Sequence, residues 1–396
     1  MRRSWTLPAL LLAVWALTRL WSVASLIKLP WVPFDVVIYS QWAEGLRAGT
    51  FPVGDQRWQY PDLMAVILLI PTYMPGTYIT GFVALSLLAD LGIMLVVLFA
   101  WHRSRGSAVG PWIWALAGIW IGPVLLVRLD LFVTLFAVLA VASLGRPLLS
   151  AVFSALGAGL KIWPAVGLVG VQRGWILRAL GMFVGVFILA ELLIRMLLPA
   201  GDSFLGAQAA RGLQAESVGV FPYLVRGLWG YPPTFVESHG TLELVSPWAN
   251  SIGLALTVFG LLLVALLAWL HWSGRLIGVL PADLVTICVI VLVVTGRVFS
   301  PQFYIWLAGL SAIALINRHS LLRLPTLLVV ASAICAWYVY PLENGWRLGE
   351  MDALLVQIVR LLLIAAALII ALVRVNRIRR GGQDEKAAAT GSLSRR

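Results

Sequence analysis

The sequence has 396 residues, of which 61% are hydrophobic and only 12% are charged, and its formal net charge is +12. Soluble proteins carry about 45–50% apolar and about 25% charged residues, so this composition excludes an ordinary soluble domain. The basic residues stand in short runs between apolar segments, which indicates membrane topology rather than a nucleic-acid-binding surface. We therefore expect an integral membrane protein whose partner is the lipid bilayer and not a nucleic acid.

The first apolar stretch, residues 7–27, follows Arg2 and Arg3. It is longer than the apolar region of a signal peptide, about 7–15 residues, and it lacks a clear cleavage site. We expect a retained first span with the N-terminus in the cytoplasm, because a crossing helix needs about 20 apolar residues. Further full-length spans are expected at residues 78–101, 179–198, 250–271, 324–340 and 352–373.

Shorter apolar segments lie at residues 111–127, 131–144, 148–160, 163–171, 280–295 and 302–316. They fit a crossing only if they are tilted, broken or packed around a polar cavity. With a turn at residues 159–164 separating two of them, about twelve spans bring the basic connections to one membrane face, as the positive-inside rule requires. The expected fold is therefore an all-α polytopic membrane protein, several of whose helices are short. Residues 1–380 form its single domain, and residues 381–396 a polar, disordered cytoplasmic tail.

This topology sends two long loops, residues 28–77 and 199–249, to the non-cytoplasmic side, and it leaves both termini in the cytoplasm. Short polar turns join them there, at residues 128–130, 161, 296–301 and 341–351. Chain segments that are far apart in sequence are thus expected to meet at one membrane face.

Asp35 lies in the first loop, a few residues beyond the first span. One interpretation is an N-cap for an amphipathic helix that starts at Val36, because Asp often precedes such a helix. The other is a carboxylate that takes a proton from a substrate hydroxyl. Both remain open from spacing alone.

Arg128, Asp130 and Lys161 stand between apolar segments, where charges are rare unless they pair or line a cavity. Arg128 and Asp130 could form a mutual surface ion pair of little energetic value. Lys161 could be a lysine that extends its ammonium to the membrane surface. Its functional interpretation is contact with an anion, since lysine binds phosphate as a point charge.

Arg297 precedes the segment from Phe299 to Gln302, in which Ser300 could be an N-cap ahead of Pro301. Arg211 and Glu216 stand five residues apart in the second long loop, so they are not neighbours on a helix face. A basic cluster with a carboxylate at a lipid–water boundary suits a lipid-linked phosphate, whose charge the cations would offset. The four histidines are isolated and both cysteines lie in apolar spans, so no metal site is expected.

These motifs, in this order, resemble those of a known enzyme family. They begin with Asp35, Tyr39, Gly49, Pro52 and Tyr60-Pro61, and continue with Arg128-Leu129-Asp130, Leu160 to Pro164, Arg211 to Ser217, Gly296 to Phe303 and Trp306-Leu307. The chain resembles the membrane-embedded glycosyltransferases of the C superfamily, and within it glycosyltransferase family 87. That family includes polyprenyl-phosphate-dependent α-mannosyltransferases and arabinofuranosyltransferases of cell-envelope lipoglycan assembly. The resemblance covers most of the chain between Phe34 and Leu307.

The resemblance implies transfer of a sugar from a polyprenyl-phosphate donor to a glycolipid or polysaccharide acceptor, with inversion, outside the plasma membrane. Mannose is the first expectation and arabinofuranose the second. Asp35 matches the general base, and Lys161, Arg297 and Arg128 would bind the donor phosphate. The implied substrate-binding residues are Tyr39, Tyr60, Asp62, Asp130, Arg211, Gln214, Glu216, Ser300 and Gln302. Asp62 departs from the family's usual Tyr-Pro-Pro. The paired acidic residues that bind a metal elsewhere in the superfamily are not seen, so no metal or other cofactor is implied.

A transporter or flippase of a lipid-linked sugar is the alternative from another functional class. It would use a similar basic cavity at membrane level. Transporters, however, tend to show inverted repeats and charges near the membrane midplane. Here the charges gather at one face and no repeat is evident, which favours the enzyme.

Overall fold

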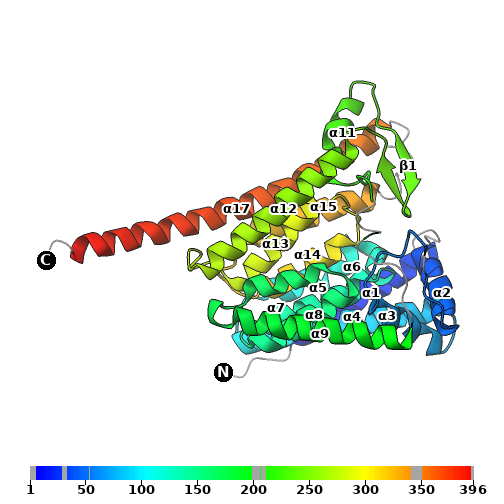
Figure 1. Cartoon of the computed structure of the whole chain (residues 1–396), viewed down its shortest axis with the longest axis horizontal. Coiled ribbons are helices and arrows are strands. Elements are labelled where there is room, and N and C mark those ends of the chain that lie inside the picture. Colours follow the sequence, from blue (N-terminus) through cyan, green and yellow to red (C-terminus); the bar gives the residue numbers. More distant parts are fainter. Residues whose placement is uncertain are drawn as a thin grey trace.

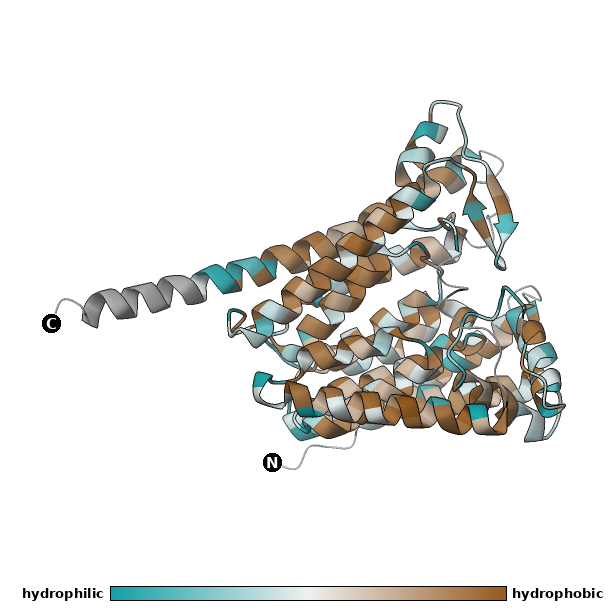
Figure 2. Ribbon diagram, viewed as in Figure 1, coloured by the Kyte–Doolittle hydropathy of each residue, from teal (hydrophilic) through white to brown (hydrophobic). Residues whose placement is uncertain are grey.

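A computed structural model describes residues 6–28, 34–52, 54–198, 206, 211–339 and 350–393. The described chain is a bundle of helices that run in roughly the same direction, with a single two-stranded hairpin at one end (Figure 1). Apolar residues follow the bundle helices, and polar residues gather at their ends (Figure 2). The expectation of a mostly helical membrane protein is confirmed at this level.

Five helices within the described ranges are long and apolar enough to cross a membrane. They are α1 (Thr6–Lys28), α4 (Tyr78–Ser104), α9 (Ile176–Leu197), α12 (Ala249–Trp272) and α17 (Met351–Leu393). Each coincides with an expected full-length span. The remaining such span, at residues 324–340, appears as the shorter helix α15 (Arg323–Val339).

The expected short segments are short helices. They are α7 (Asp130–Ala142), α8 (Pro147–Leu160), the 3₁₀ helix η3 (Trp163–Gly170), α13 (Pro281–Thr295) and α14 (Phe303–Ala314). The turn expected at residues 159–164 is present, because α8 ends at Leu160 and η3 begins at Trp163. α8 and η3 pack against each other, so the chain reverses its direction at Lys161.

The apolar segment at residues 111–127 is broken into three pieces: α5 (Val109–Ala115), α6 (Ala117–Trp120) and the 3₁₀ helix η2 (Gly122–Leu126). The Arg19 guanidinium of α1 stabilises this break, since it donates to the carbonyl oxygens of Trp114 (3.0 Å) and Ala115 (2.9 Å). Its Nε lies 2.6 Å from Oδ2 of Asp90 on α4. The buried Arg19 guanidinium, which is paired with Asp90, thus makes the hydrogen bonds that the carbonyl oxygens lose where the helix is broken.

Shorter elements cover the end of the bundle that faces away from both termini (Figure 1). They are α2 (Phe34–Arg47), α3 (Met64–Leu69), η1 (Ile70–Tyr73), η5 (Val218–Val220), α11 (Phe221–Gly227), β1 (Phe235–Ser238) and β2 (Thr241–Leu244). The expected amphipathic helix at residues 36–47 is α2, which buries Val36, Tyr39, Trp42, Ala43 and Leu46.

The antiparallel hairpin of β1 and β2 was not expected from the sequence. Ser238 pairs with Thr241 across a two-residue turn of His239 and Gly240. Both turn residues have positive φ, 52° and 70°, which is the turn that matches the twist of two antiparallel strands. Gly240 tolerates this conformation without a side chain, and the turn carries His239 to the end of the bundle.

Within the described residues α17 continues to Leu393, and the disordered cytoplasmic tail at residues 381–396 stays a prediction. Extending an existing helix requires no new nucleation, and the alanine-rich segment 387–389 has a high helix propensity. Residues 199–205, 207–210 and 340–349, which include much of two predicted outer loops, lie outside the described residues.

Candidate active site

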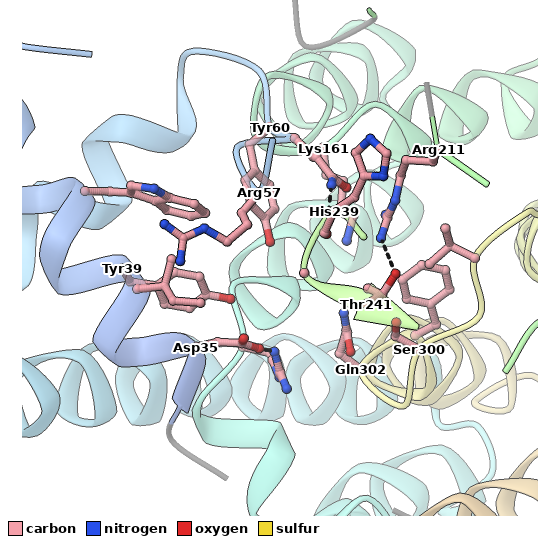
Figure 3. Close-up of a pocket in the computed structure, with 17 residues that line it drawn as sticks. Asp35, Tyr39, Arg57, Tyr60, Lys161, Arg211, His239, Thr241, Ser300 and Gln302 are labelled. Carbon is pink, nitrogen blue, oxygen red and sulfur yellow. Dashed lines mark hydrogen bonds and ion pairs between the residues drawn. The ribbon is translucent and has the colours of Figure 1, made fainter. Parts of the chain in front are cut away.

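A polar cavity of about 160 Å³ lies at the end of the bundle covered by α2 and the hairpin (Figure 3). Six distant parts of the chain contribute to its wall. The sequence predicted eight of its lining residues, Asp35, Tyr39, Tyr60, Arg128, Lys161, Arg211, Ser300 and Gln302. The expectation that these loops meet at one end of the molecule therefore holds in the structure.

Asp35 lies in the first turn of α2, which begins at Phe34. It is inside the helix rather than ahead of it, so the N-cap position before a helix starting at Val36 does not exist. Its carboxylate forms an ion pair with the Arg128 guanidinium, and about a quarter of its side chain (24%) is exposed. Arg128 therefore pairs with Asp35, and Asp130 pairs with Lys161, in place of the alternative of a mutual Arg128–Asp130 ion pair.

Lys161 projects into the cavity from the turn between α8 and η3 (Figure 3). Its Nζ lies 2.7 Å from Oδ1 of Asp130 and 4.8 Å from the centre of the Trp306 ring. Burial lowers the pKa of Lys161, and the Asp130 carboxylate acts in the opposite direction. Asp130 is itself buried and also accepts a hydrogen bond from Trp306 Nε1 at 2.7 Å. This network holds the Lys161 ammonium in place inside the cavity. The alternative, in which Lys161 extends its ammonium to the membrane surface, does not describe this arrangement.

Tyr39 and Tyr60 form an aromatic wall with Trp42, whose ring centre lies 5.8 Å from Tyr39 and 6.4 Å from Tyr60. Burial, with a smaller effect of neighbouring negative charge, raises the pKa of both hydroxyls. Both therefore stay neutral near pH 7. They can donate or accept hydrogen bonds to a sugar but cannot act as anionic bases.

Arg211 is the most deeply buried cation of the wall, with 8% of its surface exposed. Its Nη2 makes a long contact of 3.5 Å to Oγ1 of Thr241, and its Nε donates no hydrogen bond to any described residue. Burial lowers the pKa of the Arg211 guanidinium, opposed mainly by the Glu243 carboxylate. Arginine holds its charge even so, and an under-satisfied guanidinium facing a cavity is a strong anion-binding group.

Arg297, which the sequence predicts to bind the donor phosphate, is not among the residues that line this cavity. Its Nη1 donates to the carbonyl oxygen of Arg211 at 2.8 Å, and its own carbonyl oxygen accepts from the Gln214 backbone N–H at 2.9 Å. It therefore positions the Arg211 segment. Gln214 extends the same link, because its side chain hydrogen-bonds Ser300 Oγ (2.9 Å) and the Phe299 backbone N–H (2.8 Å).

A second cavity of about 280 Å³ adjoins the first. The two share Asp35, Ile38, Arg57, Arg128, Gly240, Thr241, Ser300 and Gln302. The second cavity adds Gln214, Glu216 and Glu237, and it lacks Lys161 and Arg211. Glu216 also lies 3.6 Å from Nη1 of Arg360 on α17. The first cavity is thus rich in cations, the second contains acidic groups, and Asp35 borders both.

Asp62 and Asp130, two predicted substrate-binding residues, line neither cavity. Asp62 pairs with Arg195 of α9 at 2.8 Å, and its backbone N–H donates to Glu191 at 3.1 Å. It therefore fastens the first loop to α9. Asp130 lies behind Lys161, so its contribution is to orient that lysine.

Arg57 and His239 belong to the first cavity but were not singled out from the sequence. Asp55 fixes Arg57 through Nε (2.9 Å) and Nη2 (2.7 Å), and these contacts lower the pKa of the Asp55 carboxyl to about 2. The Asp-x-Arg spacing was the available signal. His239 contacts Glu243 at 3.0 Å, and its signal was the His-Gly dipeptide between two short alternating segments.

The described part of the chain contains no cluster of three or more His, Cys, Asp or Glu residues that could hold a metal ion. Comparison with known proteins does not assign the cavity: no protein-family model matches the chain, and no curated protein matches it. Its chemistry is therefore inferred from its own geometry.

Proposed function

We propose that this protein is a membrane-embedded glycosyltransferase, which moves a sugar from a polyprenyl-phosphate donor to a glycolipid or polysaccharide acceptor. One observation carries the proposal: the Asp35 carboxylate borders two adjoining cavities that share Arg57 and Arg128. The first adds the cations Lys161 and Arg211, and the second adds the carboxylates of Glu216 and Glu237. Such an arrangement separates an anionic donor from a hydroxyl-bearing acceptor. It also places a general base between them.

The donor phosphate would occupy the first cavity, in contact with Lys161, Arg211 and Arg57. The geometry favours Arg211 over Arg297 for this role, because only Arg211 faces the cavity. Lys161 lies between two apolar helices, so it can reach a phosphate whose polyprenyl chain stays in the membrane. These cations offset the charge that develops on the phosphate as the bond to the sugar breaks.

The acceptor would occupy the second cavity, where Glu216, Glu237 and Gln302 can hydrogen-bond sugar hydroxyls. Asp35 takes the proton of the attacking hydroxyl as its oxygen bonds to the anomeric carbon. The bond from that carbon to the phosphate oxygen breaks on the opposite face, and polyprenyl phosphate leaves with the electron pair. The configuration at the anomeric carbon is therefore inverted. Following the resemblance to glycosyltransferase family 87, mannose is the first choice of sugar and arabinofuranose the second.

The proposed setting is the plasma membrane, crossed about twelve times, with both termini in the cytoplasm and catalysis outside. Two features support it. The basic connections that follow α4, η3 and α12 lie at the end of the bundle away from the cavity. The helices that border the cavity are short, and a segment that ends at a polar cavity does not have to cross the whole membrane.

Cysteine labelling tests this orientation. In a chain whose Cys288 and Cys335 are replaced, Ala48→Cys and Tyr231→Cys should react with a membrane-impermeant thiol reagent applied to intact cells. Ser104→Cys and Gly174→Cys should react only after the membrane is permeabilised. All four positions are exposed, so accessibility within the fold does not confound the comparison. Labelling of Gly174→Cys from outside would overturn the assignment of α8 and η3 as a pair.

The function is tested by incubating the purified protein with radiolabelled polyprenyl-phosphate mannose or arabinose and a glycolipid acceptor. Label should enter the acceptor, and unlabelled polyprenyl phosphate should accumulate in equal amount. Movement of the intact donor between leaflets of a vesicle, without transfer of label, would instead establish the flippase function.

A further inference from the structure

A separate cavity of about 490 Å³ lies at the opposite end of the bundle. The two ends of α14 show the separation, because Phe303 at its start lines the active-site cavity while Ile313 and Ala314 at its end line this one. The ends of α4, α7 and α13 complete the wall. The floor is apolar and includes Val141, Leu144 and Leu280.

The rim of this cavity is basic. Arg105, Arg318 and His319 line it, and two adjacent loops supply them. The loops are tied together, because the Ser107 backbone N–H donates to the carbonyl oxygen of Ile316 at 2.7 Å. Gly106 packs so closely on Ile316 that any side chain at this position would collide with it. The two arginines and His319 are thus held on one rim by backbone contacts.

Arg105 ends α4 in the left-handed conformation, with φ 50°. This position at a helix C-terminus usually holds glycine, because a side chain is strained there. The helix dipole favours a positive charge near this terminus, but Arg103 in the last turn already provides that charge, so the dipole does not require Arg105. Strained residues of this kind cluster at binding sites, where the conformation serves to aim the side chain.

The lining contains no carboxylate. Asp283, in the first turn of α13, is turned away and buried, where it accepts hydrogen bonds from Ser320 Oγ (2.7 Å) and the Leu321 backbone N–H (2.9 Å). Arg105, Arg318 and His319 form no ion pair with any described acidic residue. The cavity therefore combines excess positive charge at its mouth with an apolar interior.

We propose that this cavity binds the headgroup and upper acyl chain of an anionic phospholipid. The rim cations would contact the lipid phosphate, and the apolar floor would cover the glycerol and the first methylenes. Basic pockets between membrane helices are suited to such headgroups. A zwitterionic lipid would leave the excess charge unmatched, and a free phosphate would leave the apolar floor uncovered. The site is separate from the active-site cavities, with which it shares no lining residue.

The test is a titration of the full-length protein, in neutral detergent, with fluorescent phosphatidylglycerol. Saturable binding is expected, with phosphatidylcholine and soluble glycerol phosphate competing poorly. Loss of one cation near an anionic headgroup weakens binding by roughly fivefold. The double variant Arg105→Ala/Arg318→Ala should therefore bind roughly 30-fold more weakly. The control Arg103→Ala/Arg146→Ala removes the same charge from exposed positions outside the cavity, and it should bind like the unmodified protein.

A third variant, Ala142→Trp, leaves the charge unchanged and fills the cavity from an exposed position on its wall, so it should also abolish saturable binding. Equal loss of binding in the control double variant would reduce the effect to net charge and overturn the proposal. So would unchanged binding in Ala142→Trp, or equal competition by soluble glycerol phosphate, which would indicate a site for free anions.

Discussion

Replacement of Asp35 with asparagine is expected to abolish sugar transfer, with a loss of roughly 10²–10⁴-fold, the range found when a general base is removed. Asparagine keeps the size of aspartate but cannot accept the proton of the attacking hydroxyl. The measurement is the initial rate of label transfer at saturating donor. Binding of the donor should persist, because the cations of the first cavity are untouched.

Asp62→Asn is the matched control for this substitution. Asp62 is also an acidic residue of the first loop, but it pairs with Arg195 and lines neither cavity. We expect its transfer rate to stay within a few-fold of the unmodified protein. Near-normal transfer by Asp35→Asn, or a large loss confined to Asp62→Asn, would remove Asp35 from the role of base.

Replacement of Arg211 with alanine is expected to reduce transfer by roughly 10²–10³-fold, the usual loss when one group that stabilises developing negative charge is removed. The expectation rests on its burial and on the single, long hydrogen bond that its side chain makes to a described residue. Arg211→Lys should recover part of the activity, because lysine keeps the charge but not the planar two-pronged geometry. The rate of transfer and the affinity for the donor should both be measured.

Arg195→Ala is the matched control, since Arg195 is largely exposed and lies outside both cavities. Arg297→Ala tests the positioning role. It should impair donor use less than Arg211→Ala, and it should have little further effect when Arg211 is already alanine. Full activity of Arg211→Ala, or additive losses in the Arg211→Ala/Arg297→Ala double variant, would contradict these assignments.

The long helices could be predicted because each is a continuous apolar segment of membrane-spanning length. The turn at Lys161 could be predicted because a charge interrupts an apolar run and the positive-inside rule requires a reversal there. The broken segment at residues 111–127 could not. Its geometry depends on Arg19, more than ninety residues earlier in the chain, and no local pattern reports that contact.

The sequence was sufficient to predict which loops form the candidate site, but not which side chains within those loops contact one another. Asp35, Lys161 and Arg211 were identified and line the first cavity, whereas Arg297 is not among its lining residues. A basic residue beside a polar turn can face a cavity or a backbone carbonyl, and sequence spacing does not distinguish the two. The contribution of His239 required the hairpin, whose strands of four residues each carry only a weak alternating pattern.

The turn at Lys161 has a consequence for the surrounding bilayer. α8 has 14 residues, or roughly 21 Å of helix, and η3 has 8 residues, or roughly 16 Å of 3₁₀ helix. Neither arm matches a hydrocarbon layer of about 30 Å. Mismatch arises only where a short segment faces lipid, as α8 does through Leu148 and Leu149, and it is relieved when lipids thin there, at a cost of fractions of a kcal/mol for each ångström. In the proposed reaction, membrane thickness would therefore set how far the donor phosphate must move from the headgroup layer to reach Lys161.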